Sequence, residues 1–234
     1  MADPATAQRA LDNARALGEA SIPGPAPLGP ARGRFVAWHR SHGTPGPLLL
    51  VGRDGDRLAD QMGRLALTLQ RMPAASLPVD APWRSAGELR HAAGGWLDQL
   101  VADEVEVRER RDAIRSSIEA VCREGWSARP THGDFVPANV LMHEGRIEVL
   151  LDVTGLALRH PEVDLGWWEL VVGFHHPGDA ARLARSLRRG YGAHDAGMDE
   201  RLRDVGAVRA LQLAAAAPGA ARGHAVALLM AALG

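Results

Sequence analysis

The feature that most constrains the fold of this chain is a short polar loop followed at once by two apolar runs. The loop, residues 131–139, reads THGDFVPAN, and the runs at residues 140–143 and 147–152 are separated by Glu144 and Gly145. Two apolar runs joined by turn residues predict a β-hairpin. We therefore expect the side chains of the loop to lie beside one end of this hairpin.

Three side chains in this segment carry oxygen atoms suited to acid–base or metal chemistry. Asp134 follows Gly133, Asn139 comes later in the loop, and Asp152 ends the second apolar run. Carboxylate and amide oxygens suit Mg²⁺, which also binds phosphates, so Asn139 and Asp152 are the predicted metal ligands. Asp134 is then expected to remain unpaired and close by, where it can accept a proton from a hydroxyl or amine nucleophile.

The order and spacing of these residues, with His132 before them, resemble the catalytic core of the aminoglycoside phosphotransferase and choline kinase group, relatives of protein kinases. A second matching feature is Pro161, followed three residues later by Asp164. The resemblance implies an α+β, protein-kinase-like fold. Such a fold has a mostly helical C-terminal lobe and a small β-hairpin at the catalytic loop.

The resemblance also implies roles for individual residues. Asp134 would orient or deprotonate the substrate, and His132 is counted with it as a catalytic-loop residue that braces the loop. Asn139 and Asp152 would hold magnesium if a metal is retained, and Asp164 would be a structural brace. Departures from the family pattern occur in the loop at Val136 and Ala138 and after the metal-binding aspartate at Val153 and Thr154. These departures indicate that the loop binds an unusual ligand.

The chain contains no lysine, because all 27 of its basic residues are arginines. Schiff-base chemistry and P-loop phosphate binding both need lysine and are excluded. Kinases of the resembled group also anchor the nucleotide phosphates with a lysine of the N-terminal lobe. Arg32 or Arg34 could replace the charge of that lysine but not its geometry. ATP is therefore not among the expected cofactors.

Residues 1–51 predict only a remnant of an N-terminal lobe: a helix over residues 5–20 and short strands at 34–39 and 48–51. The first three strands of the resembled family and its glycine-rich nucleotide cover have no counterpart in this region. We therefore divide the chain into a truncated N-terminal lobe and a helical catalytic lobe, residues 52–234. A two-stranded remnant exposes strand-edge donors and acceptors, so we expect a partner chain or self-association to cover it.

The remainder of the chain has apolar residues at helical spacing. Helices are predicted at residues 56–72, 96–124, 162–174, 179–189, 199–217 and 219–233, with the single cysteine, Cys122, in the core. The resemblance makes Glu162 and Glu169 candidate substrate-binding residues, because the C-terminal lobe of the family often offers an acidic surface to a cationic substrate. Trp167 is a candidate residue of the substrate cleft. The alternative is that they form an ordinary helix start and part of the core.

Charge and hydropathy exclude several classes of partner. The net charge is −1 and the isoelectric point about 6.8, so the chain offers no basic field for nucleic acid. The N-terminus has no signal-peptide pattern, and the apolar stretch at residues 225–233 is too short to span a membrane. We expect a cytoplasmic protein that binds a small-molecule substrate rather than nucleic acid or membrane.

Three functions are consistent with these features. In the first, Asp134 deprotonates a metabolite that already carries a phosphate or sulfate, and internal displacement closes a ring, such as an aziridine, in natural-product biosynthesis. In the second, the chain is a small-molecule O-phosphotransferase whose nucleotide lobe is completed by a partner chain. In the third, it is a non-catalytic, pseudokinase-like binding partner. The first accounts best for the missing lysine.

Overall fold

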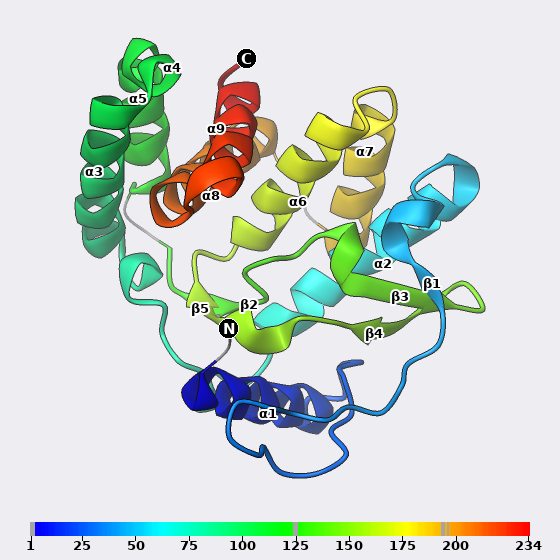
Figure 1. The fold of residues 1–234 in the computed structure, drawn as a ribbon. Coiled ribbons are helices and arrows are strands. Elements are labelled where there is room, and N and C mark those ends of the chain that lie inside the picture. The colour runs from blue at the N-terminus through cyan, green and yellow to red at the C-terminus, as the bar shows by residue number, and fades with distance from the viewer. Residues whose placement is uncertain (1–2, 124–125, 193–194, 196) are drawn as a thin grey trace. The chain divides into compact units, whose positions relative to one another are not determined.

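The computed structural model describes residues 3–123, 126–192, 195 and 197–234 (Figure 1). The fold is α+β, as predicted. Its helices are α1 (Pro4–Glu19), α2 (Gly52–Gln70), α3 (Ala86–Asp103), α4 (Val105–Glu109), α5 (Arg111–Val121), α6 (Val163–His175), α7 (Ala180–Tyr191), α8 (Met198–Ala216) and α9 (Gly219–Leu233). Its strands are β1 (Thr44–Pro45), β2 (Arg129–Thr131), β3 (Val140–His143), β4 (Arg146–Leu150) and β5 (Ala157–Arg159). None of the described helices is long and apolar enough to cross a membrane.

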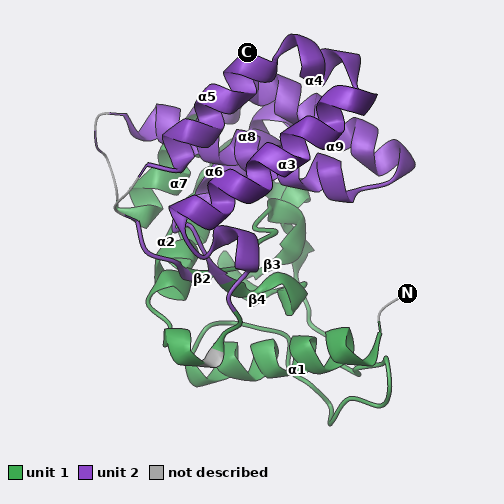
Figure 2. Cartoon of the chain, turned by 90° about the vertical axis from the view of Figure 1, so that its left-hand side faces the viewer, with its two compact units in different colours: residues 1–78, 130–157, 182–193 green, residues 79–129, 158–181, 194–234 purple. Residues whose placement is uncertain are grey.

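The chain forms two compact units, each assembled from separate stretches of sequence (Figure 2). Unit 1 contains residues 1–78, 130–157 and 182–193, and unit 2 contains residues 79–129, 158–181 and 194–234. This grouping follows contacts within the chain and does not test the division into lobes after residue 51, which stays a prediction.

Unit 1 contains a three-stranded antiparallel sheet in the order β1-β3-β4. Strands β3 and β4 form the predicted hairpin, with Val140 opposite Leu150 and a register shift after Leu141. Helix α2 buries the apolar face that its sequence predicts and packs against β4. Helix α7 approaches α2 so closely that a Cβ on Gly190 would lie 1.9 Å from the carbonyl oxygen of Asp60. Glycine is therefore required at this crossing.

The predicted strands at residues 34–39 and 48–51 are not formed. The region instead contains the two-residue strand β1 and a 3-10 helix over Gly46–Leu49. Pro45 and Pro47, just before residues 48–51, lack the backbone donors that a strand there would need to continue. Gly46 also packs so tightly that a Cβ there would lie 2.3 Å from the carbonyl oxygen of Pro137. At residues 48–51, proline placement and tertiary packing therefore outweigh the apolar pattern that predicted a strand.

Unit 2 is helical, and α8 lies at its centre, in contact with α3, α5, α6 and α9. Helices α6 and α8 cross at a pair of glycines. A Cβ on Gly166 would lie 2.5 Å from the carbonyl oxygen of Leu202, and one on Gly206 would lie 2.8 Å from the carbonyl oxygen of Gly166. The two backbones can approach this closely only without side chains at the crossing.

The single helix predicted at residues 96–124 is wrong, because three helices, α3, α4 and α5, replace its described part. The first break lies at Glu104, which has an extended backbone. The Arg108 side chain then donates hydrogen bonds to the carbonyl oxygens of Val101 (3.0 Å) and Ala102 (3.3 Å) near the end of α3. A basic side chain thus satisfies carbonyls that end the helix.

Cys122 lies in the core, as predicted, and is fully buried. Burial raises the pKa of its thiol to about 11. The thiol is therefore protonated at neutral pH and is not a nucleophile.

Candidate active site

The loop between β2 and β3 orients Asp134 through hydrogen bonds within the loop itself. Gly133 has φ +86°, a left-handed conformation that glycine adopts readily and that turns the chain before Asp134. The Nδ2 group of Asn139 donates to Oδ2 of Asp134 at 2.9 Å and to its backbone carbonyl at 2.8 Å. The Asp134 carboxylate is half-buried and is held in position by Asn139.

His132 is fully buried beneath this loop. Its Nε2 atom lies 2.8 Å from the carbonyl oxygen of Leu151, and its ring meets Phe135 edge to face at 6.2 Å. The ring therefore connects the loop to the end of β4. These contacts are those of a residue that braces the loop rather than one that touches substrate.

Asp152 follows β4 and lies exposed at the surface. Its backbone is left-handed, with φ +48° and ψ +57°, a conformation that is strained for a residue other than glycine and is concentrated at functional sites. Its Oδ1 atom accepts a hydrogen bond from the Thr154 hydroxyl at 2.7 Å. The N–H of the preceding Leu151 donates to the carbonyl of Asn139 at 2.7 Å, which ties the segments of the two predicted metal ligands together.

Asn139 and Asp152 fit a magnesium ion by the chemistry of their donors. Because Nδ2 of Asn139 is directed at Asp134, its amide oxygen is the atom it can offer to a metal. Within the described parts of the chain, no three His, Cys, Asp or Glu side chains converge to hold a metal ion by themselves. Magnesium commonly binds one or two protein ligands together with substrate phosphates, so the site is suited to a metal that arrives with an anionic ligand.

Asp152 also lines a cavity of about 410 Å³ within unit 1. Trp38, His39 and Ser41 line the same cavity, as does Leu141 of β3. This volume lies within the range of small-molecule sites. Trp38, His39 and Ser41 were not among the predicted site residues; they lie in or beside a segment predicted as a strand. The signal available was an aromatic residue next to a histidine in a segment rich in proline and glycine.

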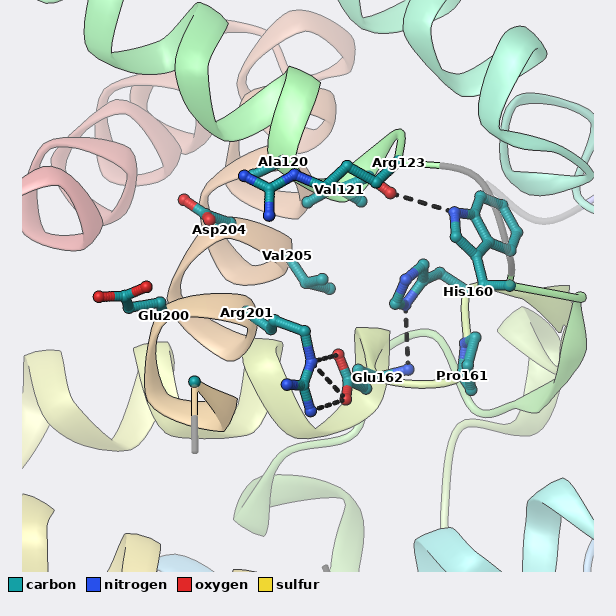
Figure 3. Close-up of a pocket in the computed structure, with 12 residues that line it drawn as sticks. Ala120, Val121, Arg123, His160, Pro161, Glu162, Glu200, Arg201, Asp204 and Val205 are labelled. Carbon is teal, nitrogen blue, oxygen red and sulfur yellow. Dashed lines mark hydrogen bonds and ion pairs between the residues drawn. The ribbon is translucent and has the colours of Figure 1, made fainter. Parts of the chain in front are cut away.

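The other predicted site residues lie in unit 2. Glu162 lines a second cavity, of about 480 Å³ (Figure 3). Its Oε1 accepts hydrogen bonds from Nε (3.2 Å) and Nη2 (3.0 Å) of Arg201, so an ion pair already engages this carboxylate. Asp164 and Trp167 are buried, and Glu169 is half-buried. Burial of Trp167 agrees with the core alternative.

The cavity at Glu162 contains a buried histidine, His160, that no sequence motif indicated. His160 accepts a hydrogen bond at Nδ1 from the N–H of Glu162 (3.1 Å) and meets Trp126 edge to face at 4.8 Å (Figure 3). Burial, together with the positive charge of Arg201, lowers the pKa of His160 to about 4. His160 is therefore neutral at physiological pH.

Comparison with models of protein families shows to which family the chain belongs. The model of the phosphotransferase enzyme family matches residues 2–205. The chain belongs to this family. This membership confirms the resemblance that the loop motif indicated. A search of curated proteins gave no significant match.

Solved structures of other phosphotransferases share the fold of this family member. Macrolide 2'-phosphotransferase MphH from Brachybacterium faecium is 22% identical with a TM-score of 0.62, over 97% of this chain and 80% of its own. Aminoglycoside 2'-phosphotransferase-IIIa in its GDP complex is 15% identical with a TM-score of 0.68, over 98% and 83%. APH(3'')-Id from Streptomyces rimosus, in complex with ADP and streptomycin, is 17% identical with a TM-score of 0.68, over 89% and 82%. The predicted kinase-like fold is therefore confirmed.

Proposed function

We propose that this chain is a small-molecule O-phosphotransferase in which Asp134 is the general base. The observation that carries the proposal is the hydrogen-bonded pair of Asp134 and Asn139 beside the fixed turn of Asp152. Asp134 would accept the proton of a substrate hydroxyl. The hydroxyl oxygen forms a bond to the terminal phosphorus of a nucleoside triphosphate, the bond to the bridging oxygen breaks, and the nucleoside diphosphate leaves.

Magnesium, held by Asn139 and Asp152, would neutralise charge on the phosphates when bound. The cavity that Asp152 shares with Trp38 supports a nucleotide at this place, because an aromatic ring can stack on a base while the anionic end lies near Asp152. Solved relatives bind GDP or ADP according to their descriptions. We place the activity in the cytoplasm, where nucleotide and magnesium are available.

The experiment that tests this function measures nucleotide binding and turnover separately. Saturating Mg-ATP or Mg-GTP should stabilise the folded chain by about 2.7 kcal/mol at 100 times the dissociation constant. That stabilisation raises the melting temperature by about 5–10 °C for a chain of this size. Asp152→Asn should remove most of this shift. No shift at millimolar nucleotide for the unaltered chain would contradict the proposal.

A second function is favoured by one specific observation, the absence of lysine from all 234 residues. In this alternative, Asp134 takes a proton from an amine of a substrate that already bears a phosphate or sulfate. A C–N bond then forms as the C–O bond breaks, the ring closes and the anion departs, received by arginine side chains. Turnover of a pre-activated amino alcohol ester without nucleotide would support this alternative, whereas obligatory release of ADP or GDP would exclude it.

We also propose that a partner chain or a second copy covers the N-terminal part of unit 1. Strand β1 is an edge strand of only two residues, both exposed. Four large apolar side chains of the same region are exposed to between 58% and 74%: Leu28, Phe35, Leu48 and Val51. Exposed apolar groups at a strand edge favour association. Sedimentation as a monodisperse monomer would count against this proposal.

A further inference from the structure

The turn that carries Asp152 is held by a residue from the first helix of the chain. Asn13 lies on α1 and is 3% exposed, among alanine and leucine side chains that form the buried face of this helix. Its Nδ2 group donates to the carbonyl oxygen of Val153 at 2.7 Å and reaches that of Leu156 at 3.5 Å. Asparagine is a weak helix former, and a buried amide is costly unless it is hydrogen-bonded. The contact with the turn explains why the amide is tolerated there.

Thr154, which lies within the turn that follows Asp152, also holds this turn. Its hydroxyl donates to Oδ1 of Asp152 at 2.7 Å, across a 3-10 helix over Val153–Gly155. Gly155 is packed so closely against the loop that a Cβ would lie 2.9 Å from the carbonyl oxygen of His132. The left-handed backbone of Asp152 is therefore held by the side chains of Asn13 and Thr154. It is also held by the contact of Gly155 with the loop at His132.

We propose that Asn13 and Thr154 are positioning residues for the metal-binding carboxylate of Asp152, so that helix α1 is a working part of the metal site. This inference rests on the proposed function for its metal. Asn13 holds the carbonyl group of Val153, the residue after Asp152. Thr154 holds Oδ1 of Asp152, and this hydrogen bond sets the direction in which Oδ2 of the same carboxylate points. Ala10, one helical turn before Asn13, lines the same cavity as Asp152 and Thr154, so α1 borders the ligand as well as the turn.

The consequence is that either side chain should control metal affinity without touching the metal. Hydrogen-bonding partners of metal ligands typically change metal affinity 10- to 100-fold when they are removed. Loss of the Asn13 amide would release the Val153 carbonyl, and loss of the Thr154 hydroxyl would release Oδ1 of Asp152. Each change relaxes the geometry of one ligand and leaves the donor atoms in place.

The test measures binding of Mn²⁺ to the full chain in the presence of ADP, by enhancement of water-proton relaxation, which requires no turnover. Asn13→Ala and Thr154→Val should each raise the dissociation constant of Mn²⁺ about 10-fold or more. Thr154→Ser keeps the hydroxyl and should remain within about twofold of the unaltered chain. Leu11→Val, a change at a buried residue of α1 that does not line the cavity, should lower the melting temperature without altering Mn²⁺ affinity.

The outcomes separate this inference from the function on which it rests. If Asp152→Asn abolishes Mn²⁺ binding but Asn13→Ala and Thr154→Val bind as the unaltered chain does, the positioning role is overturned and the metal site stands. If Leu11→Val weakens binding as much as Asn13→Ala does, the effect of Asn13 is general destabilisation, and the role is again overturned. If the unaltered chain shows no enhancement, both the metal site and this inference fail. Should Asn13→Ala fail to fold, the two Thr154 variants decide the result alone.

Discussion

The loop at residues 131–139 of unit 1 and the cavity around Glu162 in unit 2 hold their polar side chains in different ways. In the loop, Asp134 and Asn139 bond to each other five residues apart, and His132 bonds to a backbone carbonyl of the adjoining hairpin. In the cavity, Glu162 is held by Arg201, which lies 39 residues away on another helix. Local hydrogen bonds preserve a geometry that the motif itself encodes, whereas the ion pair exists only because α6 and α8 pack together.

From this difference we expect substitutions in the loop to lower turnover and substitutions in the cavity to lower the free energy of unfolding. The largest expected effect is that of Asp134→Asn, which should lower turnover by 10²- to 10⁴-fold, as removal of a general base does. The melting temperature should change little, because the new amide oxygen can still accept the hydrogen bond from Asn139. Steady-state kinetics and thermal unfolding measure the two effects. Full activity in this variant would show that Asp134 is not the general base.

The next largest effect is a loss of stability at acid pH through His160. Its pKa is about 4 in the folded chain against 6.5 as the ordinary value, so the unfolded state binds a proton first as the pH falls. The folded state has its full stability with respect to His160 above pH 6.5. Its free energy of unfolding declines between pH 6.5 and 4, by up to about 3 kcal/mol. Urea unfolding at several pH values measures the decline. His160→Gln, which cannot titrate, should show a shallower decline in this window, and an identical decline would contradict the assignment.

Gly46→Ala tests whether the catalytic loop depends on the segment before it. A Cβ at this position would lie 2.3 Å from the carbonyl oxygen of Pro137, in the 3-10 helix that ends at Asn139. We expect a destabilisation of about 1–3 kcal/mol from overpacking, with lower turnover in the fraction that folds. Gly29→Ala is the matched control, because Gly29 has open space for a Cβ and should be almost neutral. If Gly46→Ala and Gly29→Ala lower the free energy of unfolding in urea equally, the predicted dependence of the loop on Gly46 is contradicted.

The smallest effect is expected for Arg201→Gln. Arg201 is 44% exposed at its side chain, and its pairs with Glu162 and Asp195 are partly solvated, so the loss of stability should be about 1 kcal/mol or less. The same change removes a positive charge that lowers the pKa of His160, so that pKa should rise. Titration of the His160 ring by NMR measures the shift. A pKa that does not move would show that burial alone sets it.

Several features of the molecule could be predicted from sequence because they depend on short-range spacing. The hairpin of β3 and β4 and helices α1, α2 and α6 to α9 follow from local apolar periodicity. The expectation that Asp134 stays unpaired was wrong, because Asn139 donates a hydrogen bond to its carboxylate. The strands expected at residues 34–39 and 48–51 are not formed, and at the second of them Pro45, Pro47 and the close packing of Gly46 outweigh the apolar composition. The break at Glu104 also escaped prediction, since it depends on the capping of α3 by Arg108.

The sequence by itself determined the family, the kinase-like fold and the group of residues at the loop, because a motif of closely spaced polar residues can adopt few conformations around Gly133. It also determined that no lysine can contribute. Only the tertiary structure decided that Asn13 bonds to the carbonyl of Val153, 140 residues away in the turn of Asp152, and that Arg201 forms an ion pair with Glu162. Such contacts join side chains through the packing of helices, and no spacing along the chain encodes which pair will meet.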